Sequence, residues 1–189
     1  MSSEIILSQN PKIFIKDNFV NDGKCDHIIS TFKNKLKKSE VLIDGVHKEN
    51  KERSSDSAVL NHGHDALHDV LASVSKLLEY PINNLEAPQL TRYKKGDYYH
   101  AHFDAFVNQD KDYQRLKTCI IYLQNTKGGE TYFDNIDIKV IGLKGRALVF
   151  DNCFDGTNHL NPGSLHSGLK VDEGEKFILT IWACNKSFF

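Results

Sequence analysis

Cysteine and proline are scarce in this sequence, which has four of each among its 189 residues. The cysteines are far apart and include no Cys-x-x-Cys pair, so their spacing is not that of a zinc ribbon or a disulfide framework. Two of them lie in apolar runs, where a thiol behaves as a small hydrophobic group. We therefore expect reduced thiols, in a reducing compartment, at all four positions: Cys25, Cys119, Cys153 and Cys184.

The sequence also lacks a long apolar run and an excess of charge of either sign. The run Thr118–Leu123 is far shorter than the roughly 20 residues that a membrane span requires. Lys and Arg number 24 and Asp and Glu 25, so the net charge of −1 provides no overall basic field for nucleic acid or an anionic membrane. Residues 1–8 show neither the basic start nor the apolar core of a signal peptide. We expect a cytoplasmic protein without a nucleic-acid or membrane partner.

What the sequence does contain is the composition of a globular protein, with 40% apolar and 26% charged residues. Its length predicts a single domain over residues 1–189. Within that domain we expect a helical N-terminal part over residues 1–84 and a β-rich core over residues 85–189.

Apolar spacing predicts the elements of the N-terminal part. A short strand is expected at Ile13–Ile15. Apolar residues at helical spacing predict one helix that begins at an N-cap at Asp22 and reaches Leu36, and a second over Leu67–Leu78 that Pro81 ends. The polar stretch Asp44–Ser57 between them is typical of an exposed, mobile loop.

After Leu85 the pattern changes to short strand-like runs separated by glycine-containing turns. About eight such runs predict a mainly β fold, a double-sheet jelly roll (double-stranded β-helix) with the N-terminal helices supporting it. The runs are Gln89–Tyr93, Tyr99–Phe106, Lys117–Gln124, Thr131–Phe133, Ile138–Leu143, Ala147–Phe150, Ser164–Leu169 and Phe177–Ala183.

Three side chains have the pattern of a metal site. On a strand, His102 and Asp104 at positions i and i+2 share a face, so both can reach one metal ion. His166 follows 62 residues after Asp104, near the other end of the β-rich part. Two histidines and one carboxylate are the ligands of the non-heme Fe(II) facial triad, which leaves positions open for a cosubstrate and O₂. The pair His64 and His68 has no third ligand nearby, and a solvated helix start is the better interpretation.

Lys176 is a candidate for binding an anion. If the run Glu173–Trp182 forms a strand, Lys176, Ile178, Thr180 and Trp182 share one face. A lysine directed into a barrel mouth would be costly unless an anion such as a dicarboxylate paired with it. The alternative is a solvent-exposed lysine that only begins the strand.

Taken in order, these residues resemble the prolyl 4-hydroxylase family of Fe(II)/2-oxoglutarate dioxygenases over about residues 85–185. The resemblance depends on six ordered motifs together with Trp182, and more weakly on Arg53-Ser54-Ser55, which is similar to an Arg-Thr-Ser stretch near the family's active site. The motifs are Tyr93…Gly96…His102-x-Asp104, Arg115-x-x-Thr118 leading into Tyr122-Leu123, Gly128-Gly129-Glu130-Thr131, Lys144-Gly145-Arg146-Ala147…Phe150, Ser164-x-His166-x-Gly168, and Val171-x-x-Gly174-x-Lys176.

The resemblance implies a role for each matched position. It implies that His102, Asp104 and His166 hold Fe(II), with 2-oxoglutarate and O₂ as cosubstrates and ascorbate as a supporting reductant. Lys176 would then pair with the far carboxylate of 2-oxoglutarate. The remaining matches imply a cosubstrate pocket at Tyr93, Thr131 and Tyr122 and a substrate side at Arg115, Trp182 and Arg53.

The implied reaction is hydroxylation of a prolyl residue in a peptide or protein, with release of succinate and CO₂. The stretches Asp44–Ser57 and Val107–Gln114 are the parts expected to cover the substrate. Two alternatives stay open: the same chemistry on a free amino acid or another side chain, and a metal-binding jelly roll without turnover. The target protein, the position of hydroxylation and the oligomeric state do not follow from the sequence.

Overall fold

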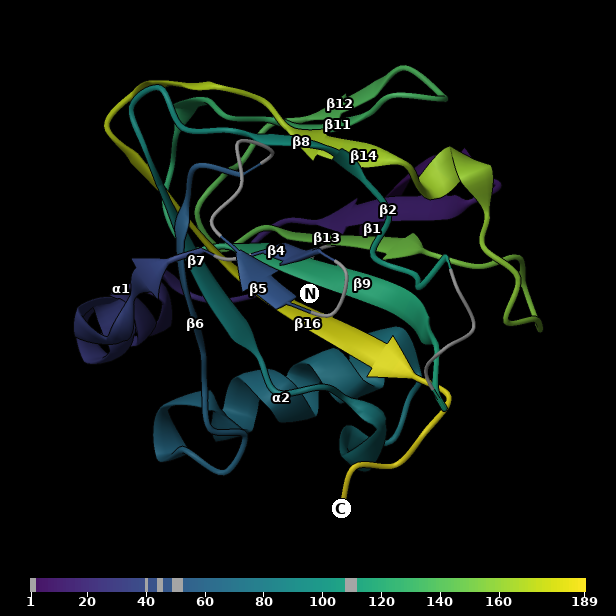
Figure 1. Ribbon diagram of the computed structural model, residues 1–189. Helices are drawn as coiled ribbons and strands as arrows, with labels where there is room; N and C mark the ends of the chain where they lie inside the picture. The colour runs from purple at the N-terminus through teal and green to yellow at the C-terminus, as the bar shows by residue number, and fades with distance from the viewer. Residues whose placement is uncertain (1–2, 40, 44–45, 49–52, 108–111) are drawn as a thin grey trace.

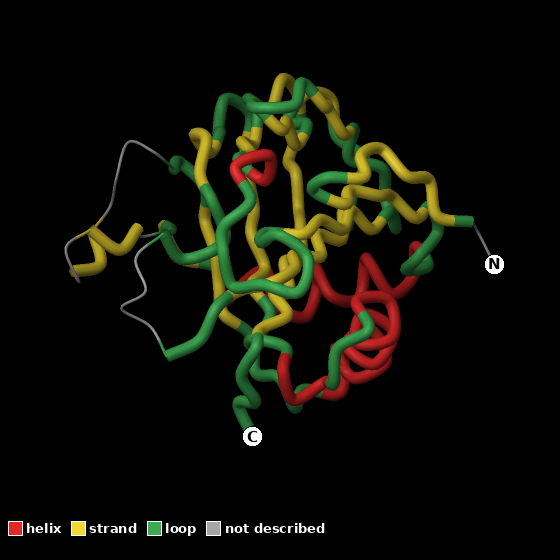
Figure 2. The backbone as a smooth tube through the Cα atoms, turned by 90° about the vertical axis from the view of Figure 1, so that its right-hand side faces the viewer, coloured by secondary structure: helices red, strands yellow, loops and turns green. Residues whose placement is uncertain are grey.

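The computed structural model describes residues 3–39, 41–43, 46–48, 53–107 and 112–189. The described chain forms three layers, with a small sheet above a large sheet and two helices below the large sheet (Figure 1). Seen from the side, the helices lie together under the strands, and the C-terminus lies at the same end of the molecule (Figure 2). None of the described helices is long and apolar enough to cross a membrane.

The large sheet is antiparallel and has 8 strands in the order β1-β2-β13-β9-β16-β7-β6-β3. Its strands are β1 (Glu4–Gln9), β2 (Lys12–Lys16), β3 (Lys37–Lys38), β6 (Asp56–Val59), β7 (Gln89–Lys94), β9 (Arg115–Tyr122), β13 (Ala147–Asp151) and β16 (Glu175–Cys184).

The small sheet has 4 strands in the order β12-β11-β14-β8, again antiparallel. Its strands are β8 (Tyr99–His102), β11 (Thr131–Phe133), β12 (Ile138–Val140) and β14 (His166–Gly168). Two further pairs complete the strands, β4 (Val41–Ile43) with β5 (Val46–Lys48) and β10 (Lys127–Gly128) with β15 (Val171–Glu173). The two facing sheets confirm the expected jelly roll.

Strand β16 shows how the sequence positions both the core and the site. Alternate residues of a strand point to opposite faces. One face of β16 packs its apolar side chains against the helices, and the other points between the two sheets. The core-facing residues are Phe177, Leu179, Ile181 and Ala183; those facing the space between the sheets are Lys176, Ile178, Thr180 and Trp182. The face assignment predicted from the sequence is therefore confirmed.

The two helices cover the lower face of the large sheet. Helix α2 (Asp65–Leu78) buries the apolar stripe predicted for it and ends at Glu79, which has a φ of 59° two residues before Pro81. Helix α1 (Asp22–Phe32) is shorter than predicted. Its N-cap is Asn21, whose side chain accepts a hydrogen bond from the Lys24 backbone N–H, so the assignment of Asp22 as N-cap was wrong. Short 3-10 turns follow or precede strands at Lys33–Lys35, Ile82–Asn84 and Pro162–Ser164.

The N-terminal part is less helical than the sequence indicated. Strands β1, β2, β3 and β6 come from residues before 85 and extend the large sheet at both edges. The stretch Asp44–Ser57 was predicted to be an exposed loop. Residues 44–45 and 49–52 lie outside the described part, but Arg53 and Ser55 are buried and β6 begins at Asp56. An exposed loop was the wrong interpretation for these last residues, because their polar side chains are paired inside the site.

Candidate functional site

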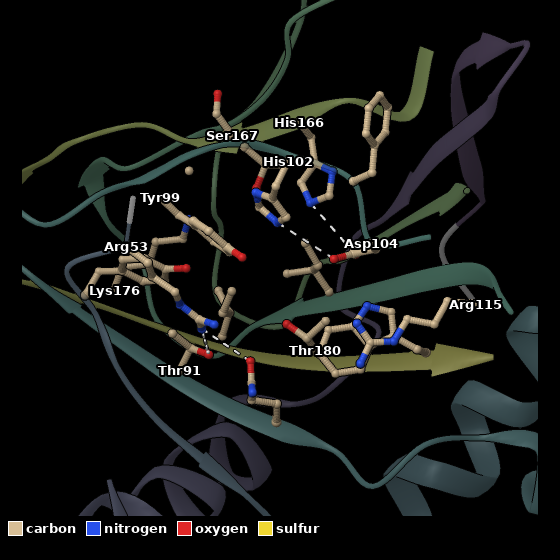
Figure 3. A pocket seen from close by; sticks show the side chains of 18 residues that line it. Arg53, Thr91, Tyr99, His102, Asp104, Arg115, His166, Ser167, Lys176 and Thr180 are labelled. Atoms are coloured by element: carbon tan, nitrogen blue, oxygen red, sulfur yellow. Dashed lines mark hydrogen bonds and ion pairs between the residues drawn. The ribbon is translucent and has the colours of Figure 1, made fainter. Parts of the chain in front are cut away.

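The predicted metal ligands meet where the small sheet faces the large one. His102 is the last residue of β8 and His166 the first of β14, and the two residues are direct partners across these strands. Asp104 lies beyond the end of β8, so its placement on the same strand as His102 was wrong. The chain bends after His102 and still brings the carboxylate to both imidazoles. One ligand atom from each residue lies within 4.8 Å of the others (Figure 3).

Both imidazoles are oriented with Nε2 toward Asp104 and Nδ1 hydrogen-bonded to the backbone, as metal ligands commonly are. His102 Nε2 lies 3.7 Å from Asp104 Oδ1, and His166 Nε2 lies 3.8 Å from Asp104 Oδ2. On the far side of each ring, Nδ1 donates to a backbone carbonyl, that of His100 at 2.8 Å and that of Ser164 at 3.0 Å. A proton fixed on Nδ1 leaves Nε2 free to coordinate. Burial, assisted by the His166 ring, lowers the pKa of His102 to about 3, so His102 is neutral as a ligand must be.

The carboxylate of Asp104 is oriented from behind by buried polar groups. Thr118 donates its hydroxyl proton to Asp104 Oδ2 at 2.7 Å, and Asn152 Nδ2 donates to the Thr118 oxygen at 2.8 Å. Burial by itself would raise the pKa of Asp104, but the imidazoles of His166 and His102 outweigh it, so the pKa is lowered and the group is ionised. Two imidazoles and one carboxylate form a donor set that fits Fe(II).

Lys176 enters the same cavity from β16 as a buried cation. It is 2% exposed, and its Nζ donates to the Gly129 carbonyl at 2.6 Å. Within the described part of the chain no carboxylate forms an ion pair with it. Burial lowers the pKa of the Lys176 ammonium to about 8. A buried cation whose hydrogen-bond partner is neutral fits an anionic ligand, and the other end of such a ligand can reach the metal position.

Gly129 makes room for the lysine chain. Its φ is +69°, and a Cβ at this position would lie 2.9 Å from Val171 Cγ2 and 3.3 Å from Lys176 Cδ. Behind the lysine, the hydroxyls of Tyr122 and Thr131 are hydrogen-bonded at 2.7 Å, and the Tyr122 ring lies 5.8 Å from Nζ. These contacts fix the Lys176 ammonium at one end of the cavity.

Arg53 is a second buried cation at the same end. Its guanidinium donates to neutral oxygens of Ser55 and Thr91 at 2.7 and 3.0 Å, and it lies 4.8 Å over the ring of Tyr99. Tyr99 in turn stacks on His102, with ring centroids 3.7 Å apart. Arg53, from the stretch Asp44–Ser57, is therefore connected to the metal ligand His102 through one aromatic ring.

Arg115 lies at the opposite end of the cavity from Lys176 (Figure 3). Its guanidinium donates two hydrogen bonds of 2.7 Å to the Glu86 carboxylate and lies 3.8 Å over the indole of Trp182. Charged and aromatic groups in this arrangement form a flat, amphipathic wall. The Trp182 indole N–H is buried, and its hydrogen bonding toward Asp104 contributes to the lowered pKa of that carboxyl.

The structure brings the predicted residues together in one cavity of about 170 Å³. All of them line it except Tyr122, which lies directly behind Thr131. His100 has an exposed side chain and is not one of the clustered ligands, but its backbone carbonyl accepts the hydrogen bond from His102 Nδ1. His64 caps α2, where its Nδ1 accepts a hydrogen bond from the Ala66 N–H. Among the described residues, His102, Asp104 and His166 form the one group of three or more possible ligands close enough together to hold a metal ion.

Several residues of the site were not predicted. Tyr99 gave no signal, because a tyrosine on a strand most often packs in the core. Thr118 and Glu86 act through side-chain pairs that are distant in sequence, and no local pattern reveals such pairs. The other unpredicted residues that line the cavity are Gln89, Thr91, Phe103, Ile120 and Ser167.

Comparison with known sequences gives consistent matches. The sequence model of the 2OG-Fe(II) oxygenase superfamily matches residues 88–184, which include every residue of the cavity except Arg53. The chain is 35% identical to the probable prolyl 4-hydroxylase 6 of Arabidopsis thaliana, over 96% of this chain and 72% of that protein. It is 31% identical to a putative prolyl 4-hydroxylase of Acanthamoeba polyphaga mimivirus, over 94% of this chain and 76% of that protein.

A solved structure is similar over nearly the whole chain. It is the viral collagen prolyl hydroxylase of Paramecium Bursaria Chlorella virus-1 in complex with 2-oxoglutarate. The TM-score is 0.76 at 30% sequence identity, with 91% of this chain and 95% of that chain covered. The likeness extends beyond the metal ligands to the full arrangement of the two sheets.

Proposed function

The chain belongs to the 2OG-Fe(II) oxygenase superfamily and, within it, to the prolyl 4-hydroxylase family, and on this premise we propose that it hydroxylates a prolyl residue in a peptide or protein. The reaction uses Fe(II), 2-oxoglutarate and O₂ and releases succinate and CO₂. One observation carries the proposal: an oriented His–Asp–His donor set shares a cavity with a buried lysine that lacks an ion-pair partner among the described residues.

The residues at the Lys176 end would hold the cosubstrate. His102, Asp104 and His166 would bind Fe(II), and Lys176 would pair with the far carboxylate of 2-oxoglutarate. When bound, the metal and 2-oxoglutarate supply the oxidising power that inserts one oxygen atom of O₂ into a C–H bond. The protein contributes position and exclusion of water. Its Tyr122–Thr131 pair and the bulk of Tyr93 keep the lysine end of the cavity dry, since both tyrosines are at most 4% exposed.

The residues at the Arg115 end would receive the substrate. An aromatic face covered by a guanidinium suits a proline ring and the peptide groups beside it, because it offers apolar area and hydrogen-bond donors together. Arg53, which lies just before β6, packs on Tyr99 at the opposite end of the cavity from Arg115. In this arrangement a peptide would lie across the cavity mouth, with its prolyl C–H over the metal position.

The compartment is also part of the proposal. All four cysteines are buried free thiols, and burial raises the pKa of Cys25, Cys119 and Cys153. Unreactive thiols of this kind are compatible with a reducing, cytoplasmic environment. Ascorbate would support turnover as an external reductant.

The test is a comparison of substrates with the purified protein, Fe(II) and 2-oxoglutarate. With a proline-containing peptide, the amount of succinate formed from 2-oxoglutarate should rise in proportion to the amount of peptide added. The peptide should gain the mass of one oxygen atom on proline. Free proline in place of the peptide should give neither result. If only free amino acids are turned over, the substrate assignment fails. If no substrate increases succinate release although Fe(II) binds, the chain is a metal-binding module instead.

A further inference from the structure

The C-terminal segment, Asn185–Phe189, runs back from the end of β16 beside the residues that lead into β9 (Figure 1). The Asn185 backbone N–H donates to the Gln114 carbonyl at 3.2 Å, and the Gln114 backbone N–H donates to the Asn185 side chain at 2.8 Å. Lys186 forms an ion pair with Asp112. The segment is therefore attached to the chain at the entrance of β9 by both backbone and side chains.

The Gln114 side chain connects the C-terminal segment to residues of the active site by hydrogen bonds. The residue is 8% exposed, and its side-chain amide bonds both backbone groups of Phe106. Its Oε1 accepts from the Phe106 N–H at 2.7 Å, and its Nε2 donates to the Phe106 carbonyl at 3.0 Å. The same Oε1 accepts from the Arg115 N–H at 3.0 Å. One side chain thus fixes Phe106, two residues after the ligand Asp104, to Arg115 of the substrate wall.

An aromatic chain runs parallel to these hydrogen bonds. Phe188 packs edge-on against Tyr113, with centroids 5.4 Å apart and an interplanar angle of 88°. Tyr113 packs edge-on against Phe106 at 5.3 Å and 86°. The Arg115 guanidinium then lies 5.1 Å over Phe106 and 3.8 Å over Trp182. The stack connects the penultimate residue of the chain to the interior of the cavity.

We propose that Phe188 is a positioning residue of the active site, which holds the Arg115–Trp182 wall in place through Tyr113 and Phe106. The inference rests on the proposed function, because it assigns the wall to the peptide substrate. Phe188 reaches neither the metal position nor Lys176, since it is not among the cavity-lining residues. Its contribution concerns peptide binding and the coupling of 2-oxoglutarate consumption to hydroxylation.

The neighbouring residue provides a matched control. Phe189 belongs to the same segment and is 64% exposed, but its ring packs on His62 at 4.8 Å rather than on Tyr113. Phe188→Ala and Phe189→Ala therefore remove the same side chain from adjacent positions, and only the first interrupts the stack. Phe188→Tyr retains an aromatic ring and should rescue the function of the wall.

Two measurements test the proposal with the full-length chain. Trp182 is the only tryptophan in the sequence, so intrinsic fluorescence reports on the wall without metal or substrate. Phe188→Ala should shift the emission and increase acrylamide quenching, whereas Phe189→Ala and Phe188→Tyr should resemble the wild type. In turnover, Phe188→Ala should raise the KM for a proline peptide about two- to tenfold, the value of one edge-to-face aromatic contact. The KM for 2-oxoglutarate should stay unchanged.

The outcomes are distinguishable. Equal fluorescence and equal peptide KM for the two alanine variants would overturn the inference while leaving the proposed function intact. A parallel rise in the KM for peptide and for 2-oxoglutarate would also overturn it, because the effect would then be general loosening of the fold. If the wild-type protein hydroxylates no peptide, the proposed function fails, and the fluorescence comparison still decides whether Phe188 holds the wall.

Discussion

Thr118 and Asp104 form a buried hydrogen bond of 2.7 Å that aims the carboxylate at the two imidazoles. Thr118 comes from the large sheet, whereas Asp104 follows a strand of the small sheet, so this contact joins the two layers at the metal position. Asn152, also fully buried, donates to the threonine oxygen and leaves its hydroxyl proton for Asp104. Loss of a side chain that orients a metal ligand commonly lowers metal affinity, although by less than loss of the ligand itself.

Replacing Thr118 should therefore weaken metal binding without touching a ligand. Thr118→Val keeps the shape but removes the hydroxyl, and we expect Fe(II) affinity to fall about 10- to 100-fold. Thr118→Ser retains the hydroxyl and should stay close to wild type. Anaerobic titration with Fe(II) measures the affinities. Equal affinities for the valine and serine variants would show that the carboxylate needs no such support.

Removal of a ligand should have the larger effect. His166→Ala should abolish Fe(II) binding and turnover while the circular dichroism spectrum stays that of the wild type, because the ring lines the cavity and lies outside the apolar cluster that includes the helices. His159→Ala is the control, since His159 is exposed and does not line the cavity. Full activity of His166→Ala would refute the assignment of the metal site.

In the absence of 2-oxoglutarate, burial of the Lys176 charge should lower the free energy of unfolding. The fall of its pKa from the ordinary 10.5 to about 8 corresponds to about 3 kcal/mol of unfavourable burial of the charged form. Lys176→Met should therefore raise the free energy of unfolding in urea at pH 7 by a substantial part of this amount. The same variant should raise the KM for 2-oxoglutarate at least about thirtyfold, because a buried charge-assisted contact is lost. A less stable variant with an unchanged KM would contradict both statements.

The same lysine predicts a pH dependence whose sign can be worked out. Below pH 8 Lys176 is charged in both folded and unfolded protein, and the cost of burial is fully present. Between pH 8 and 10.5 the folded protein binds fewer protons than the unfolded one, so this group's penalty is relieved as pH rises. Binding shows the opposite trend, since the neutral amine holds a carboxylate weakly. We expect kcat/KM for 2-oxoglutarate to fall above about pH 8 while the KM for peptide stays flat.

Two glycines with nearly equal φ allow the cost of backbone strain to be measured apart from the cost of a side-chain clash. Gly129 has a φ of +69° and its Cβ would collide with Val171 and press on Lys176, whereas Gly156 has a φ of +68° and nothing within 4 Å. Gly156→Ala should cost about 1–2 kcal/mol of stability from backbone strain alone. Gly129→Ala should cost more and should also raise the KM for 2-oxoglutarate. Equal losses of stability at both positions, with no change in the KM for 2-oxoglutarate, would show that the space Gly129 leaves for Lys176 is unimportant.

The sequence predicted those parts of the molecule in which local pattern and burial agree. Strand β16 alternates regularly, so the face that Lys176 shares with Ile178, Thr180 and Trp182 could be predicted, whereas its burial was only one of two alternatives. Helix α2 has a continuous apolar stripe that the large sheet covers. The metal ligands were found because the His-x-Asp spacing holds even though the chain leaves β8 after His102.

The failures concern contacts between distant polar residues. Arg53 and Ser55 look like loop residues, yet they are buried because Thr91 on a neighbouring strand accepts a hydrogen bond from the guanidinium. Gln114 makes hydrogen bonds to the backbone of Phe106 and Arg115, and no periodic signal marks a residue that acts this way. Helix α1 ends before Leu36 because the chain tightens into a 3-10 turn after Phe32.

Strand β16 fixes the separation between the residue that would bind 2-oxoglutarate and the residues that would bind the substrate. Lys176 and Trp182 lie on one face of it, six residues apart, which at about 3.3 Å per residue sets roughly 20 Å between their Cα atoms. Because β7 and β9 flank it on both sides, this length cannot stretch. A one-residue deletion between the two would turn one of them into the apolar core. New substrates can therefore be accommodated by changing side chains on the wall, while the separation between Lys176 and Trp182 stays constant.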